Sequence, residues 1–254
     1  MSALNPEVSD EADGEQPAEV DVVCIFPTAS EAGGLVDKLS SVKASTCNGF
    51  VERTGTLNET RIAVIESTLQ DEAFARCIRD VLVLRKPQWA IAGGFAMAVD
   101  NRTRRGEIVV ADHIIDRRDY SLSTGTRMAE SKGLRVGPML TVDMFPSEPD
   151  KQQELAATKA IACDTQASVV AEVCRVLKVK MMAIHVVAKR QSATSSLMKQ
   201  VKSQESIAGL IGAAAGAIIE NPGTVKEFWN DKEDALKLSD RLAAFLEGVI
   251  RQLK

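Results

Sequence analysis

The 254-residue sequence predicts a single α/β domain built around a largely buried central sheet. Short apolar runs rich in β-branched residues alternate along the chain with stretches whose apolar residues have helical spacing. The apolar runs show no alternation with polar residues, as expected for strands that are covered on both faces. Hydrophobic residues make up 45% of the chain and charged residues 26%, which excludes general disorder and a fibrous repeat.

The expected elements begin near residue 20. Residues 1–19 contain six acidic residues and no lysine or arginine, which predicts a disordered acidic tail before one domain at residues 20–254. Ser30 is expected to cap a short helix that begins at Glu31 and ends near Ser40. Apolar runs predict strands at 20–26, 61–67, 89–92, 107–110, 139–142, 160–164 and 181–187, and helical spacing predicts helices at 71–85 and 167–177.

The C-terminal third is expected to be helical. An apolar stripe from Ala235 to Leu253 is expected to pack over the sheet, with contact to a partner helix as the alternative. Gly209, Gly212 and Gly216 lie in an apolar run with no preceding strand, so they indicate close helix packing rather than phosphate binding.

Composition and charge exclude several functional classes. The formal net charge is −4, and because six acidic residues lie in the first nineteen positions, the rest of the chain is nearly neutral. A neutral body with 4% aromatic residues argues against nucleic-acid binding through a basic face or through base stacking. The longest apolar run, 207–219, is too short to span a bilayer, and no signal peptide is visible. We therefore expect a cytoplasmic protein without membrane contact.

The cysteines and histidines indicate no metal site and no disulfide framework. The five cysteines are odd in number, widely spaced and without a C-x-x-C motif, and the two histidines stand far from any cysteine pair. Four cysteines lie in apolar runs and are expected to be buried free thiols. No metal or organic cofactor is expected.

In an open α/β sheet, ligands bind beyond the carboxyl ends of the strands. The segments that follow the predicted strands therefore form the expected rim of a pocket: 31, 67–70, 93–97, 143–145, 164–166 and 188–190. Gly93 and Gly94 are expected to form a turn that lets a ligand approach the backbone, and close packing of sheet and helix is the equal alternative.

Several blocks of the sequence resemble the purine nucleoside phosphorylase and nucleosidase superfamily, most closely the methylthioadenosine/S-adenosylhomocysteine nucleosidase branch. The blocks are V-V-C-I-F-P-T-A-S-E-A-G-G-L-V-D-K-L at 22–39, P-Q-W-A-I-A-G-G-F-A-M-A-V-D-N-R-T-R-R-G-E-I-V-V-A-D at 87–112, L-T-V-D-M-F at 140–145, C-D-T-Q-A-S-V-V-A-E-V-C at 163–174 and M-M-A-I-H-V-V-A-K at 181–189. The resemblance implies a single-domain phosphorylase/hydrolase-like fold with a twisted, partly closed mixed sheet flanked by helices. It also implies a nucleoside pocket and cleavage of an N-glycosidic bond.

The resemblance implies roles for residues at matching positions. Glu31 matches the family's glutamate that orients the attacking water, and a first-turn glutamate favoured by the helix dipole is the structural alternative. Phe145 matches the aromatic residue that stacks on the purine, with a core position as the alternative. Gly94, Phe95 and Ala96 lie in the segment that adjoins the ligand in the family.

The sequence departs from the family where the chemistry takes place. The ribose-binding Met-Glu pair reads Thr165-Gln166, and an amide lacks the charge that stabilises an oxocarbenium ion. The Ser-Asp pair whose aspartate protonates the purine reads Ala188-Lys189, and His185 stands where an arginine or another residue precedes that pair.

Lys189 is the sharpest of these departures, because lysine gives up its proton reluctantly at neutral pH unless burial lowers its pKa. We expect Lys189 to point into the pocket and to pair with Glu31, and a solvent-facing position is the alternative. Residues 67–70 lack the glycines of the family's phosphate loop, so water is favoured over phosphate as the nucleophile.

The sequence is compatible with two functions. One is a nucleosidase that cleaves a purine nucleoside or thionucleoside, with Glu31 and Lys189 as catalytic residues and with substrate contacts at Gly94, Phe95, Ala96, Phe145, Thr165, Gln166 and His185. The other is a catalytically silent member that binds a nucleoside-like ligand or serves as an assembly subunit. The resemblance also implies a homo-oligomer.

Overall fold

The structure is a computed structural model that describes residues 18–47, 49–116, 118, 120–146, 154–189 and 222–253, without the side chains of 189 and 222–231. Its strands are β1 (Val22–Phe26), β2 (Ser40–Cys47), β3 (Phe50–Leu57), β4 (Thr60–Ser67), β5 (Trp89–Ala98), β6 (Ile108–Ile115), β7 (Ser121–Ser123), β8 (Leu134–Thr141), β9 (Ala162–Asp164) and β10 (Lys180–Lys189). Its helices are α1 (Ala29–Val36), α2 (Asp71–Arg85), α4 (Ala167–Leu177) and α7 (Pro222–Ile250).

The strands form one mixed sheet that closes on itself at one end. The order is β10-β6-β8-β9-β5-β1-β4-β3-β2, and β10 also pairs with β5. Strands β5, β10, β6, β8 and β9 therefore form a closed ring, and β1, β4, β3 and β2 extend from it as an open sheet. The twisted, partly closed sheet expected from the sequence is confirmed.

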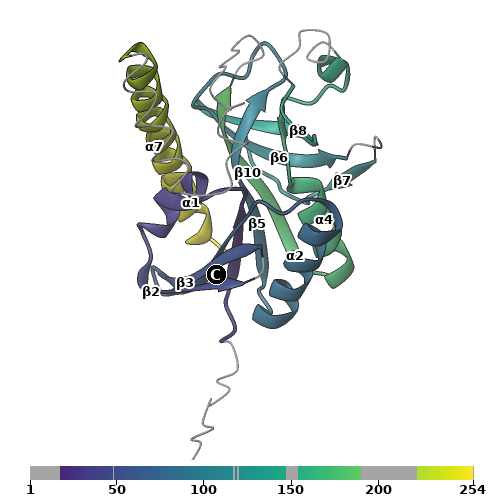
Figure 1. The fold of residues 1–254 in the computed structure, drawn as a ribbon. Coiled ribbons are helices and arrows are strands. Elements are labelled where there is room, and N and C mark those ends of the chain that lie inside the picture. Colours follow the sequence, from purple (N-terminus) through teal and green to yellow (C-terminus); the bar gives the residue numbers. More distant parts are fainter. Residues whose placement is uncertain are drawn as a thin grey trace, which may run out of the picture.

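Helices cover both faces of the sheet, with α1 and α7 on one side and α2 and α4 on the other (Figure 1). Each helix buries one apolar stripe. In α2 the stripe includes Phe74, Ile78 and Val81, which pack in the same cluster as alternate residues of β1 and β5. In α7 it includes Leu242 and Leu246, which pack with the other face of the same strands. The expected packing of the C-terminal stripe over the sheet is confirmed.

A buried ion pair fastens the end of α2 to the sheet. The Arg85 guanidinium donates to both carboxylate oxygens of Glu52 on β3, at 2.8 and 2.6 Å. The two side chains are 11% and 8% exposed. Pro87 and the left-handed backbone of Lys86, with φ 45°, end the helix at this point.

Several boundaries differ from those that the sequence predicts. Helix α1 begins at Ala29 and ends at Val36, with Thr28 rather than Ser30 before its first turn. Strands β2, β3 and β7 were not predicted. Every residue of β2 is exposed, and neither β3 nor β7 contains a continuous apolar run of the kind that predicts a buried strand. Gly93 and Gly94 lie inside β5 rather than in a turn after it, because β5 continues to Ala98 to close the ring.

The structure also bears on the predicted cysteines, on the apolar run near residue 210 and on membrane spans. Four of the cysteines are buried free thiols, as expected, and Cys47 is exposed. The apolar run 207–219 with its three glycines lies outside the described residues. None of the described helices is long and apolar enough to cross a membrane.

Candidate functional site

The site residues meet at the level of Gly94, where strands arrive from two directions. Strands β1, β4, β5 and β10 run parallel to one another, whereas β6, β8 and β9 run the opposite way. His185 of β10 pairs with Gly94. Ile25 of β1 pairs with Ala92, so the residues just after β1 reach the same level. The open and closed parts of the sheet join here, and ligands of α/β proteins bind at such switch points.

Glu31 leans from the first turn of α1 over β5. Its Oε2 accepts a hydrogen bond from the backbone N–H of Phe95 at 2.6 Å, and its Oε1 accepts one from the Thr28 hydroxyl at 3.0 Å. Burial raises the pKa of Glu31 to about 7, with the negative charge of Asp164 adding to the rise, while the two hydrogen bonds oppose it. A carboxyl with this pKa exchanges a proton near neutral pH, as a general acid or base must.

Gly94 is required for this position of Glu31. A Cβ at residue 94 would lie 2.4 Å from Glu31 Oε2 and 3.0 Å from Pro27 Cδ. The φ angle of +147° is also one that other residues rarely adopt. Close approach to the Glu31 side chain therefore explains why glycine stands here.

Ser239 of α7 holds α1 in place. Its hydroxyl accepts a hydrogen bond from the backbone N–H of Gly34 at 2.9 Å and donates one to the backbone carbonyl of Glu31 at 3.1 Å. Because the backbone of Glu31 is tied to the long C-terminal helix, its carboxyl does not depend on the eight-residue α1 alone for its position.

Asp164 organises the start of α4. It is 2% exposed. Its Oδ2 accepts hydrogen bonds from the backbone N–H groups of Gln166 and Ala167 at 2.9 and 2.6 Å, and its Oδ1 accepts one from the Thr141 hydroxyl at 2.8 Å. Four N–H groups at the start of every helix have no partner within the helix, and the Asp164 carboxylate binds two of those at the start of α4.

The Gln166 side chain crosses from the start of α4 to the end of β4. Its Nε2 donates to the backbone carbonyl of Ser67 at 2.9 Å. Its Oε1 is buried and has no hydrogen-bond partner within the described part of the chain. In the sheet order, β5 and β1 lie between β9 and β4. The amide therefore links the start of α4 to the end of β4 and leaves its Oε1 as an unused acceptor.

His185 is the third titratable group at this level. It is 2% exposed, and its Nε2 lies 3.6 Å from Asp164 Oδ2. Burial lowers the pKa of His185, and the charge of Asp164 opposes that change. With Nε2 directed at the carboxylate, Nδ1 is left without a hydrogen-bond partner among the described residues.

The other predicted site residues have different surroundings. Phe95 is partly buried beside the cluster under α1 and α7. Phe145 packs on a separate small cluster that includes Met97. Ala96 is buried in the core under α2 and α4, so its side chain does not line an open surface. Thr165 is half-buried between Asp164 and Gln166.

Lys189 is the last residue of β10, and its backbone pairs with Met97. Its side chain lies outside the described atoms, so its expected ion pair with Glu31 stays a prediction.

Two residues of the site, Asp164 and Ser67, fall within the expected pocket rim but had no predicted role, and Ser239 was not predicted to be near the site. Asp164 had a weak signal in the sequence, because it is an aspartate three residues before Ala167, the first residue of α4, where a carboxylate can bind the unpaired N–H groups of the first turn. Ser67 contributes through its backbone, and Ser239 acts across the fold, so neither leaves a local pattern.

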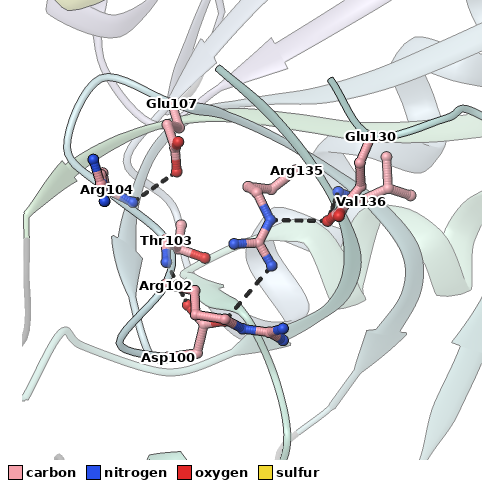
Figure 2. Close-up of polar contacts among 8 residues, drawn as sticks. All are labelled: Asp100, Arg102, Thr103, Arg104, Glu107, Glu130, Arg135 and Val136. Carbon is pink, nitrogen blue, oxygen red and sulfur yellow. Dashed lines mark hydrogen bonds and ion pairs between the residues drawn. The ribbon is translucent and has the colours of Figure 1, made fainter. Parts of the chain in front are cut away.

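A cluster of polar residues lies at the connection from β5 to β6 (Figure 2). Asp100 accepts a hydrogen bond from the backbone N–H of Thr103 at 2.7 Å. Arg135, at the start of β8, donates to Glu130 at 2.8 Å and lies 3.8 Å from Asp100. Arg102 also pairs with Asp100, at 3.6 Å. The ion pair between Arg135 and Asp100 thereby links the connection after β5 to the start of β8.

Comparison with solved structures places this arrangement among known folds. A methylthioadenosine/S-adenosylhomocysteine nucleosidase from S. pneumoniae, solved with the transition-state inhibitor MT-ImmA, matches with a TM-score of 0.68 and 14% identity, over 92% of this chain and 100% of that one. The Arabidopsis thaliana 5′-methylthioadenosine nucleosidase matches with a TM-score of 0.67 and 13% identity, over 93% and 97% of the two chains. A Helicobacter pylori futalosine hydrolase mutant matches at 0.57 and 14%, over 72% and 93%.

This chain has the nucleosidase fold. The fold that the blocks at 22–39 and 87–112 imply is thereby confirmed, although no protein-family model and no curated protein matches the sequence. At 13–14% identity the likeness is one of fold. Within the described part of this nucleosidase fold, no group of three His, Cys, Asp or Glu residues is placed to hold a metal ion.

Proposed function

We propose that this protein hydrolyses the N-glycosidic bond of a purine nucleoside or thionucleoside, with Glu31 as the base that activates water. One observation carries the proposal: the Glu31 carboxyl is fixed against the Phe95 backbone at the switch point of the sheet, with a pKa of about 7. The solved proteins of similar fold include nucleosidases that act on methylthioadenosine, adenosylhomocysteine or futalosine.

The reaction divides into steps that residues of this chain can serve. The oxygen of a water molecule bonds to the anomeric carbon while the bond from that carbon to the base breaks. Glu31 in its ionised form takes the proton from the water, and the leaving base takes up a proton as it departs. We propose Lys189 as the donor of that second proton, because it stands where the family has an aspartic acid.

Sugar contacts belong to the segment after β9. The unused acceptor of Gln166 supports binding of a sugar hydroxyl. Phe145 and Phe95 are proposed to line the pocket beside the base, and Gly94, Thr165 and His185 to shape it. Phosphorolysis is less favoured, because residues 67–70 of the sequence carry no glycine for a phosphate cradle.

The second candidate is a protein that binds a nucleoside without cleaving it. The neutral amide of Gln166 favours it, since the matching family position carries a charge that stabilises the developing cation. We also propose that the protein acts as a homo-oligomer, in line with its resemblance to the family.

Release of free base tests the two candidates directly. Methylthioadenosine, adenosylhomocysteine, inosine and uridine are each incubated with the wild-type protein, with E31Q and with E72Q. Glu72 is an exposed glutamate of α2 and serves as the matched control. We expect base release by the wild-type protein and E72Q, and a loss of about a hundredfold or more in E31Q. Hydrolytic activity that survives E31Q contradicts the role of Glu31. Binding of nucleosides without any base release favours the silent protein.

The pH dependence of hydrolysis is a second test of Glu31 as the base. Because the ionised form of Glu31 acts as the base, hydrolysis is expected to rise with pH through about 7, the pKa of this carboxyl. A profile that is flat from pH 6 to 8 contradicts the assignment of the base.

A further inference from the structure

We infer that Ser239 of α7 is a positioning residue for the proposed base: its hydroxyl fixes the first turn of α1 and thereby holds the Glu31 carboxyl against β5. This inference rests on the proposed function and deepens it by adding a residue that acts through Glu31. Three features of the structure support it: the contacts of the Ser239 hydroxyl, the weakness of α1 as an isolated helix, and the close crossing of α1 and α7.

The Ser239 hydroxyl uses both of its hydrogen-bonding roles on the backbone of α1. It accepts a hydrogen bond from the N–H of Gly34 at 2.9 Å and donates one to the carbonyl of Glu31 at 3.1 Å. The residue is 1% exposed, so these contacts are made away from solvent. Only a side chain that both donates and accepts can join these two backbone groups, and the side chain of alanine does neither.

Helix α1 depends on such contacts because its own sequence favours a helix only weakly. It has eight residues, and two of them are the adjacent glycines Gly33 and Gly34. Glycine disfavours the helical conformation, and so short a helix is unstable in isolation. Thr28 precedes the helix, but its hydroxyl donates to the Glu31 carboxyl instead of capping the backbone. Contacts with the rest of the fold therefore decide where the first turn of α1 lies.

Helix α1 lies against α7, and their backbones meet at Gly34 (Figure 1). A Cβ at residue 34 would lie 2.7 Å from the backbone carbonyl oxygen of Ser239 and 2.9 Å from the backbone nitrogen of Asp240. A Cβ at Gly33 would meet no atom within 4 Å. Gly34 thus permits the approach that brings the Ser239 hydroxyl to the α1 backbone.

The position of the α1 backbone matters at the far end of the Glu31 side chain, where Oε2 accepts the 2.6 Å hydrogen bond from the N–H of Phe95. Without the Ser239 hydroxyl, α1 stays on the sheet because Ala32 and Leu35 are fully buried, but its first turn is free to shift. The hydrogen bond from Phe95 then weakens. Since this bond opposes the effect of burial, its weakening raises the pKa of Glu31 further.

NMR of the full-length protein follows this link through the backbone amide proton of Phe95. Its chemical shift reports the hydrogen bond to Glu31, and the change of that shift with pH reports the titration of the carboxyl. Asp164 and His185, the other titratable groups at this level, are unchanged in every variant. In parallel, kcat and KM are measured for base release from whichever of the four nucleosides named above the wild type cleaves fastest.

Four variants form two matched pairs. S239A removes the hydroxyl, and V249A removes apolar contacts of the same helix ten residues further on, about 15 Å away. G34A drives a methyl group into the α7 backbone, and G33A places one in open space. We expect S239A and G34A to move the Phe95 amide proton upfield and to lower kcat by about tenfold or more with KM nearly unchanged. V249A and G33A should match the wild type in both, and in S239A the titration midpoint should lie above about 7.

The outcomes separate this inference from the proposed function. An amide proton or a kcat that is the same in S239A as in V249A overturns the inference and leaves hydrolysis standing. A shifted amide proton in S239A and G34A, in a protein that releases no base, overturns hydrolysis and supports the positioning of Glu31 by Ser239. Should S239A fail to fold, G34A and G33A decide, and identical results for these two overturn the inference.

Discussion

Replacement of Glu31 by glutamine is expected to make the protein more stable above neutral pH and to leave it nearly unchanged near pH 4.5. Both contacts of the carboxyl survive the change. The amide oxygen of glutamine can accept the hydrogen bond from Phe95, and its NH₂ group can donate to the Thr28 hydroxyl. The glutamine therefore imitates the protonated form of Glu31 at every pH.

The magnitude follows from the pKa of Glu31. Burial raises it from 4.5 to about 7. Below pH 4.5 the carboxyl is protonated in both states, so it adds no pH dependence. Between pH 4.5 and about 7 the unfolded chain has lost the proton that the folded protein keeps, so the free energy of unfolding falls as pH rises. At about 1.4 kcal/mol per unit of pKa, the full rise corresponds to a loss of about 3.5 kcal/mol above pH 7, which is reduced to about 2–3 kcal/mol because the side chain is partly exposed.

Urea unfolding at intervals from pH 4.5 to 8.5 measures this difference. At a slope of about 1–3 kcal/mol per molar urea, E31Q is expected to unfold at a midpoint about 1–2 M higher than the wild type at pH 8. Other groups titrate in the same range, but they are common to both proteins and cancel in the difference. E72Q is the control and should follow the wild type throughout. Curves for E31Q and wild type that stay parallel from pH 4.5 to 8.5 would refute the buried, proton-holding Glu31.

Three further predictions concern single contacts. G94A should lose about 1–3 kcal/mol of stability and most of its base release, because the added Cβ overlaps Glu31 Oε2. G33A is the control and should keep both properties, since its Cβ meets open space. Thermal unfolding and the base-release assay check this prediction, and a fully active G94A contradicts it. R85M should cost about 3–5 kcal/mol in urea unfolding by leaving Glu52 buried without its partner, and the double variant R85M/E52Q should recover part of the loss; an unaffected R85M contradicts the role of the pair. Burial lowers the pKa of His185 from 6.5, so the wild type should lose stability relative to H185Q as pH falls below 6.5. Urea unfolding from pH 7.5 to 5 measures this. A difference in unfolding free energy between the two proteins that does not change with pH contradicts a buried neutral histidine.

The pattern of apolar residues was enough to predict the layers of the fold. Helix α2 at Asp71–Arg85 and helix α4 at Ala167–Leu177 were predicted at their observed bounds, because a helix that packs on a sheet must show one apolar stripe and must end at signals such as Pro87. The strands buried on both faces were found for the same reason, since continuous apolar sequence is what such a position requires. Strand β2 was missed because an exposed edge strand places no such demand on its residues.

The sequence also marked Glu31 and Gln166 as candidates, but the states of these residues depend on partners far along the chain. Phe95 and Asp164 act on the pKa of Glu31 from 64 and 133 positions away, and the Ser67 carbonyl that turns the Gln166 amide is 99 positions away. Local spacing carries no information about such distances, because hydrogen bonds and desolvation depend on where the backbone places each group. The sequence therefore decided which elements form and which residues stand near their ends, and the closed ring of strands decided which of those residues meet.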